Sequence, residues 1–300
     1  MSAEPTFSLI VATYGRAEVL RPLVASLAAQ TYRSFEVIVA DQNADGRVIA
    51  ELAPLQAAGR IAAHLKLDKP NLSAARNAGI AVARGRFIAF PDDDCWYEAD
   101  TLARAAGHLL PAEGPDGLAA RWSEARPEPG DDDPAPIRPE AIRKFRGGNL
   151  ASITLFLKRD RVTMVGGFDE RIGVGRWYGA AEETDLVMAL IARGARIRHA
   201  SDVIVHHSVT DPSVQVAKPG LERARARGTG ALYAKHRLPA WVVARGVLSP
   251  LLVAPGPRLV AGAARSLGRL EGMIRWRLAE ESKHPRSPAT RNEPHPSQET

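Results

Sequence analysis

The feature that most constrains the fold is an alternation of short apolar runs with helix-like segments over the first two hundred residues. The apolar runs have the length and the β-branched content of strands: residues 7–12, 35–40, 61–65, 86–90 and 203–205. Between them lie segments with apolar residues at helical spacing: residues 17–30, 73–84 and 182–193. Alternating strands and helices are typical of crossover units, so we expect an α/β fold with a largely parallel sheet covered by helices.

Polar residues stand where three of these apolar runs end. Thr13 follows the first run, Asp41 follows the second, and Asp92 follows the fourth after a single proline. In open α/β sheets, ligands bind outside the carboxyl ends of the strands. The sequence therefore predicts one candidate site at this edge of the sheet.

The acidic triplet 92–94 directly follows an apolar strand. Alternation in an extended segment points Asp92 and Asp94 the same way and Asp93 the other way. Two carboxylates at the mouth of a sheet suit Mg²⁺ or Mn²⁺, and such a metal can bridge to a diphosphate. The alternative is a solvated acidic turn, which is how we interpret the triplet 131–133 within the proline-rich loop 124–140.

The net charge of +6 is unevenly placed. Residues 218–300 hold 15 Lys and Arg against 6 Asp and Glu, whereas residues 1–217 hold 25 against 28. We expect a slightly acidic catalytic domain over 1–217, a basic amphipathic helical extension over 218–280 and a disordered tail over 281–300. The single cysteine, Cys95, excludes a disulfide framework and a four-cysteine zinc site.

The basic extension interleaves arginines with apolar residues over 221–280. Its most apolar part, 241–254, is interrupted by Arg245 and Pro250 and is shorter than the ~20 residues of a spanning helix. Interfacial helices fit better, with Trp241 and Trp276 at the lipid boundary. The alternative is helices packed on the catalytic domain with a solvated basic face. A nucleic-acid partner is not expected, because no aromatic-basic recognition motif accompanies the charge.

Several segments, taken together and in order, resemble the family 2 glycosyltransferases of the GT-A fold. They are residues 8–16, 35–41, 71–79, 90–96, 147–149, 166–170 and 182–186, so the resemblance covers about residues 6–210. It implies a Rossmann-like nucleotide-sugar-binding sheet with flanking helices. It also implies a metal-dependent, inverting transfer of a sugar from a nucleoside diphosphate-sugar to a glycan or lipid-linked acceptor, in cell-surface polysaccharide or glycolipid synthesis.

The resemblance assigns donor and metal roles to particular residues. Donor-binding places in the family fall here on Thr13, Tyr14, Arg16, Asp41, Arg76, Asn77 and Asp92. Asp92 and Asp94 match the family's D-x-D motif for Mn²⁺ or Mg²⁺. A histidine after the last strand completes the metal shell in some relatives, and we favour His206 over His207. Gln42 stands where the family usually has a second acidic residue, so the donor base stays open.

The acidic segment 182–185 matches the family's motif for the general base. The resemblance favours Glu183, with Glu182 and Asp185 as alternatives, although the family commonly has Asp at the second position. A carboxylate base there deprotonates the acceptor hydroxyl, and attack from the face opposite the leaving group inverts the anomeric carbon. The acceptor side is expected at four residues: Gly148, Asn149, Trp177 and Tyr178.

Three other classes of protein remain as alternatives. A sugar nucleotidyltransferase would normally show a glycine-rich basic loop after the first strand, and residues 13–16 are not that. A non-enzymatic basic protein that binds membranes or nucleic acid would explain the last third of the chain but not the ordered carboxylates. An inactive transferase would not be expected to keep both Asp92 and Asp94. The N-terminus shows no basic stretch followed by an apolar run, so we expect a cytoplasmic protein, peripheral on the inner face of the cell membrane.

Overall fold

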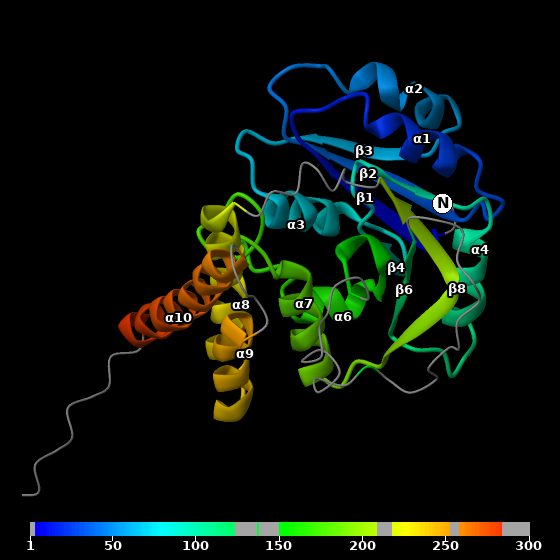
Figure 1. Cartoon of the computed structure of the whole chain (residues 1–300). Helices are drawn as coiled ribbons and strands as arrows, with labels where there is room; N and C mark the ends of the chain where they lie inside the picture. The colour runs from blue at the N-terminus through cyan, green and yellow to red at the C-terminus, as the bar shows by residue number, and fades with distance from the viewer. Residues whose placement is uncertain (1–3, 124–136, 138–149, 209–217, 253–257, 284–300) are drawn as a thin grey trace, which may run out of the picture.

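An eight-stranded sheet runs through the protein in the order β3-β2-β1-β4-β7-β6-β8-β5 (Figure 1). The computed structural model describes residues 4–123, 137, 150–208, 218–252 and 258–283. The strands are β1 (Phe7–Thr13), β2 (Phe35–Asp41), β3 (Ile61–Lys66), β4 (Phe87–Ala89), β5 (Cys95–Tyr97), β6 (Gly117–Ser123), β7 (Leu155–Lys158) and β8 (Ile197–His207).

The sheet is largely parallel, as expected, with β7 and β5 as its two antiparallel strands. Strands β3, β2, β1 and β4 are parallel to one another, as their helical crossovers require. The strand β7 pairs antiparallel with both β4 and β6, and β5 pairs antiparallel with β8. The strands β6 and β8 pair parallel with each other and run in the same direction as β4, so six of the eight strands share one direction.

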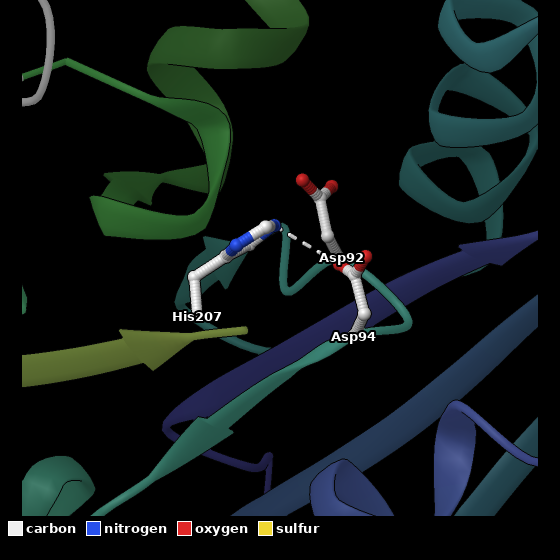
Figure 2. A group of neighbouring side chains, drawn as sticks. All are labelled: Asp92, Asp94 and His207. Atoms are coloured by element: carbon white, nitrogen blue, oxygen red, sulfur yellow. Dashed lines mark ion pairs between the residues drawn. The ribbon is translucent and has the colours of Figure 1, made fainter. Parts of the chain in front are cut away.

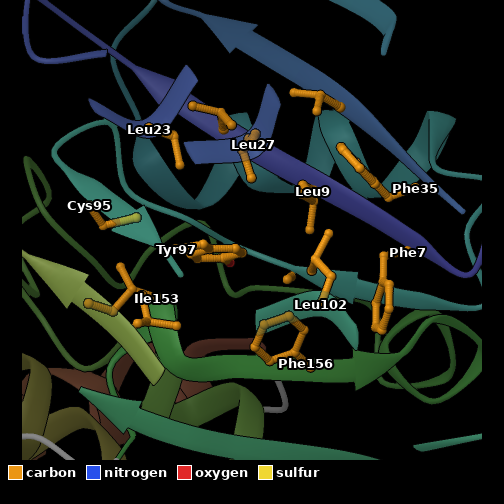
Figure 3. Packing of buried hydrophobic residues seen from close by; sticks show 14 of the residues in the cluster. Phe7, Leu9, Leu23, Leu27, Phe35, Cys95, Tyr97, Leu102, Ile153 and Phe156 are labelled. Atoms are coloured by element: carbon orange, nitrogen blue, oxygen red, sulfur yellow. The ribbon is translucent and has the colours of Figure 1, made fainter. Parts of the chain in front are cut away.

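Helices cover both faces of the sheet (Figure 1). They are α1 (Leu20–Ala28), α2 (Ile49–Ala57), α3 (Leu72–Val82), α4 (Thr101–Leu109), α6 (Arg159–Met164) and α7 (Glu182–Ala192), with a short 3₁₀ turn η1 (Ser152–Thr154). Successive side chains of β1 point to opposite faces of the sheet and so contribute to the hydrophobic core on each face. Leu9 points to the face of α1, α2 and α4, whereas Ile10 points to the face of α3, α6 and α7. Figure 3 shows the first of these cores, which also buries Cys95.

Most of the expected elements are present, with shifted ends. The helix α3 is capped by Asn71, whose Oδ1 accepts from the Ala74 N–H, and not by Ser73. Ser73 is buried instead and donates to the Ile172 carbonyl. The proline-rich loop 124–140 lies outside the described residues except for Ile137.

The basic extension forms three helices, α8 (Pro219–Lys235), α9 (Ala240–Leu252) and α10 (Arg258–Lys283). The helices α8 and α10 approach closely because glycines line their contact. A Cβ at Gly230 would overlap the Arg269 carbonyl, and one at Gly272 would overlap the Arg227 carbonyl. The helix α10 includes the first three residues of the expected tail, and residues 284–300 lie outside the described part. Among the helices that the structure describes, none is both long and apolar enough to cross a membrane.

We expect the substitution Gly79→Ala to destabilise the protein by about 1–3 kcal/mol, the usual cost of overpacking a core. Gly79 lies in α3, and an added Cβ would overlap the Ile10 side chain on β1. Gly107→Ala is the matched control, since Gly107 lies in α4 with no atom within 4 Å of the added Cβ. It should stabilise by up to about 1 kcal/mol through helix propensity alone. Denaturant unfolding measures both, and equal effects would contradict the close packing of α3 on β1.

Candidate active site

The loop between β4 and β5 carries the acidic triplet across the carboxyl end of β1. Asp92 forms an isolated bridge with Ala12, which holds the loop against that strand end. Asp93 turns toward β1, where its Oδ2 accepts a 3.0 Å hydrogen bond from Thr13. Burial raises the pKa of Asp93 to about 6. The middle aspartate thus anchors the loop, and its two neighbours face the other way.

Asp92 and Asp94 meet His207, which lies at the end of β8 (Figure 2). One potential ligand atom from each of the three lies within 4.8 Å of the others. His207 Nε2 is 3.1 Å from Asp94 Oδ1. The hydrogen bond with Asp94 raises the pKa of His207 to about 8, and the same bond lowers the pKa of Asp94. Burial raises the pKa of Asp92. Two carboxylates and an imidazole on one point are a donor set for a divalent cation.

The expectation that His206 would join this group is wrong. Its Nε2 lies 3.2 Å from Glu98 Oε1, and its ring stacks on Trp96 at 5.4 Å between centroids. Adjacent side chains on a strand diverge, so only one of the two histidines faces the aspartates. The register of β5 on β8, which pairs Trp96 with His206, decides which one it is.

Arg76 lies at the centre of the site and is only 2% exposed. Its Nη2 donates to Asp92 Oδ1 at 3.0 Å and to Ser152 Oγ at 2.7 Å. Its Nη1 is 3.5 Å from Glu182 Oε1. The sequence predicted a donor-binding residue here. The structure instead commits the guanidinium to protein groups, and it joins the aspartate loop to the acidic segment of α7.

The three acids of α7 have three different environments. Glu182 pairs with Arg76, while Asp185 pairs with Lys235 and His236 at 2.7 Å each. Among the described residues, no side chain forms an ion pair or hydrogen bond with Glu183. Burial, followed by the charge of Glu182, raises the pKa of Glu183 to about 8. Glu183 is therefore the acid of this segment left to accept a proton from outside the protein.

A pocket of about 520 Å³ lies beside the ends of β1 and β2. Its lining consists of Tyr14, Gly15, Gln42, Asn43, Ala44, Arg47, Lys66, Leu67, Asp68 and Pro70. Tyr14 is 57% exposed, so its ring offers a free face. The pocket combines this ring with amide groups and two cations, which suits a planar, hydrogen-bonding ligand attached to phosphate.

Asp41 is buried next to this pocket, and its contact with the donor stays a prediction. Its Oδ1 accepts from the Asn43 backbone and side chain, and its Oδ2 from Lys66 at 3.0 Å. Burial opposes the charged form, but these hydrogen bonds and one with His64 outweigh it and lower the pKa of Asp41. Asp41 thus fixes the pocket floor.

Two more predicted donor residues also turn toward the protein. Thr13 is 1% exposed and holds Asp93, as described above. Asn77 accepts from the Phe168 N–H and donates to the Phe168 carbonyl, so it fastens the turn that follows α6. Arg16 does remain at the rim, with its side chain 57% exposed and Nη2 3.3 Å from Asp94 Oδ2.

The expected acceptor-side aromatics contact the C-terminal helices. The guanidinium groups of Arg227 and Arg275 lie 4.4 and 4.3 Å from the Trp177 ring centroid. Tyr178 packs edge-on against Trp276 at 5.5 Å. The two residues therefore pack the extension onto the sheet domain, and their role on the acceptor side stays a prediction. Trp276 is buried in this contact, so it does not lie at the lipid boundary that was expected for it. The other predicted acceptor residues, Gly148 and Asn149, lie outside the described residues.

Residues 8–154, which run from β1 through η1, match the family model described as Glycosyl transferase family 2. This segment, just under half of the chain, belongs to that family. It is 36% identical over 109 residues to the Bacillus subtilis protein EpsH, named as a glycosyltransferase, covering 34% of this chain and 31% of EpsH. It is 34% identical over 110 residues to a PGL/p-HBAD biosynthesis glycosyltransferase of Mycobacterium tuberculosis, covering 36% of this chain and 43% of that protein. The chain thus spans less than half the length of these relatives.

Solved structures share the fold over nearly the whole chain. Residues 1–349 of TarS from S. aureus, in complex with UDP-GlcNAc, superpose with a TM-score of 0.58 at 17% identity, covering 91% of this chain and 92% of that one. The mannosyltransferase PcManGT from Pyrobaculum calidifontis, in complex with GDP-Man and Mn²⁺, gives 0.57 at 18% identity, covering 94% and 76%. The fold is therefore the GT-A arrangement that the sequence motifs predicted.

Proposed function

We propose that this protein is a metal-dependent, inverting glycosyltransferase. It would move a sugar from a nucleoside diphosphate-sugar to a hydroxyl of a glycan or lipid-linked acceptor. One observation carries the proposal: the buried Arg76 pairs both with Asp92 of the group Asp92, Asp94 and His207 and with Glu182, the neighbour of Glu183. A carboxylate base beside a site for a diphosphate-bound cation is what such a transfer requires.

The pocket beside Tyr14 is the proposed nucleoside site. The base would stack on the exposed ring of Tyr14. The amide groups of Gln42 and Asn43 line the same pocket and would form hydrogen bonds with the edge of the base. Arg47 and Lys66 bring positive charge to the same pocket. The bound UDP-GlcNAc of TarS and GDP-Man of PcManGT support a nucleotide-sugar donor for this chain too, with its base still open.

Asp92, Asp94 and His207 would hold the cation, and imidazole among the ligands favours Mn²⁺ over Mg²⁺. When bound, the metal supplies charge neutralisation at the leaving diphosphate. Arg16 projects from the rim beside Asp94, with more than half of its side chain exposed, and its guanidinium would add hydrogen bonds to the same phosphates.

Glu183 would accept the proton of the acceptor hydroxyl. The hydroxyl oxygen then forms its bond to the anomeric carbon while the bond from that carbon to the diphosphate oxygen breaks. Attack from the opposite face inverts the carbon. The raised pKa of Glu183 suits a base that works near neutral pH. Arg76, fixed between Asp92 and Glu182, would keep the acids and the metal group in one arrangement.

The acceptor side remains the broadest part of the proposal. The names of the mycobacterial relative and of an Erwinia amylovora relative, the amylovoran biosynthesis glycosyltransferase AmsB, support a role in polysaccharide or glycolipid synthesis. We propose a cytoplasmic enzyme on the inner face of the cell membrane. The helix α10 supports this with a stripe of exposed apolar residues at helical spacing: Val260, Leu267, Leu270, Ile274 and Leu278. The net charge of +9 over 218–300 would draw this stripe to anionic lipid.

We expect His207→Gln to weaken Mn²⁺ binding at least ~10-fold, the scale on which perturbed metal sites lose affinity. The loss of the imidazole ligand removes one of three donors. His206→Gln is the matched control and should bind Mn²⁺ within twofold of the native protein, because His206 faces Glu98. Titration calorimetry with Mn²⁺ in the presence of UDP measures both. An equal loss in the two variants would contradict the assignment of His207.

We expect Glu183→Gln to lower kcat by about 10²-fold or more, the usual contribution of a general base. The native rate should rise with pH around a midpoint near 8, because a raised carboxyl pKa leaves the ionised form scarce at pH 7 and abundant above pH 8. A panel of nucleotide sugars with Mn²⁺, scored for donor hydrolysis, identifies the donor for these rates. If Glu183→Gln turned over normally while Glu182→Gln did not, the base would be Glu182.

We expect the protein to bind vesicles of anionic phospholipid, more weakly as salt is added. The double substitution Leu267→Asp and Ile274→Asp should reduce this binding at least tenfold, because both side chains lie in the exposed stripe of α10. Leu110→Asp, at an exposed leucine just after α4, should leave it unchanged. Co-sedimentation measures the bound fraction, and a native protein that stays in solution at low salt would overturn the membrane proposal.

A further inference from the structure

Two residues at the C-terminal end of α8 bind Asp185 in the first turn of α7, the helix that carries the acidic segment. Lys235 Nζ lies 2.7 Å from Asp185 Oδ2 and 2.8 Å from Asp169 Oδ2. His236 Nε2 lies 2.7 Å from Asp185 Oδ1. Both carboxylate oxygens of Asp185 are therefore engaged, and Asp185 is only 2% exposed. Buried charged hydrogen bonds of this kind fix geometry more firmly than surface pairs do.

A second set of contacts holds the chain just before α7. The Gly179 N–H donates to the Ala224 carbonyl of α8 at 3.0 Å. Gly228 of α8 lies so close to this segment that a Cβ there would overlap the Ala180 carbonyl. Ala181, the residue before α7, has a left-handed φ of +83°. A non-glycine residue keeps such a φ only where neighbouring contacts stabilise it, and here the contacts of residues 179 and 180 with α8 do so.

The contacts of Lys235 and His236 with Asp185 determine to which side of α7 the Glu183 side chain points. The two residues are two positions apart, which is about 200° around a helix axis, so they lie on nearly opposite sides of α7. A first helical turn lacks half of its backbone hydrogen bonds and frays unless something anchors it. With Asp185 held against α8, Glu183 lies on the side of the helix that faces away from Lys235 and His236.

We infer that Lys235 and His236 are positioning residues, which act through Asp185 to hold the first turn of α7 and with it Glu183. The basic extension is then part of the scaffold of the active site as well as a candidate membrane contact. This inference rests on the proposed role of Glu183 as the base. It concerns residues beyond the segment 8–154 that matches the family model.

The test compares Lys235→Met with Arg265→Met in the full chain. Methionine keeps the length of each side chain and removes the charge. Arg265 is the matched control, since it pairs with Glu222 at 2.6 Å and so joins α10 to α8 through a pair that includes no acid of 182–185. We expect Lys235→Met to lower kcat at least tenfold and to move the midpoint of the pH–rate curve. The Kd for UDP with Mn²⁺ should stay within twofold, because the nucleoside pocket and the metal group lie elsewhere. Arg265→Met should keep kcat within twofold, even if its Tm falls by as much as the Tm of Lys235→Met.

Two further variants separate positioning from simple stability. Lys235→Arg should restore most of kcat, because a guanidinium can bridge Asp169 and Asp185 in the same way. Combining Lys235→Met with Asp185→Asn should cost no more than either change alone, since the pair acts as one unit. If Lys235→Met does not fold, His236→Ala compared with His236→Gln repeats the comparison, with glutamine still able to donate to Asp185.

The outcomes distinguish this inference from the assignment of the base. A normal kcat for Lys235→Met, or an equal loss of kcat in Lys235→Met and Arg265→Met, would overturn the positioning role. An active Glu183→Gln variant would instead remove the base assignment on which the role depends. An inactive Glu183→Gln together with a fully active Lys235→Met leaves the proposed function standing and the positioning role refuted.

Discussion

The rest of the site depends on one buried cation. Arg76 is almost wholly removed from water, and a guanidinium in that position is stable only where acceptors surround it. Its acceptors come from the loop after β4, from η1 and from α7, which are far apart in the sequence. The requirement to match one charge therefore draws three separate elements together. Without Arg76, Glu182 would be a buried carboxylate with no other cationic partner among the described residues, and Asp92 would lose its 3.0 Å ion pair.

Local patterns predicted the half of the sheet that is built from crossovers. The strands β1 to β4 are apolar runs, and α1, α3 and α7 carry apolar residues at helical spacing. The local sequence therefore predicts each of these elements. In the other half, β8 contains the apolar run 203–205, whereas β5 and β6 give no such signal. The strand β5 is three residues long, and β6 (Gly117–Ser123) contains glycine, three small residues and arginine. Their places depend on partners up to a hundred residues away, which no local pattern contains.

The candidate site divides in the same way. A motif fixes where a residue stands along the chain, and the acids of 92–94 and 182–185 were found on that basis. The direction of each side chain depends on packing, and so Thr13, Asn77 and Trp177 turned out to face the protein. His206 and His207 differ only by the register of β8 on β5. No sequence pattern indicated that Asp185 pairs with Lys235 and His236, because these partners lie some fifty residues downstream.

The edge position of β5 has a consequence for how the molecule is made. Residues 95–97 join the sheet through residues 205–207, so this pairing cannot form until β8 has left the ribosome. A nascent chain that stops after the family-matched segment carries both aspartates but neither His207 nor the acids of α7. Contacts this distant in sequence form late and slowly. The site is thus complete only after residues 182–207 have been made. A fragment that ends at residue 154 would keep Asp92 and Asp94 but lack His207 and the acids of α7.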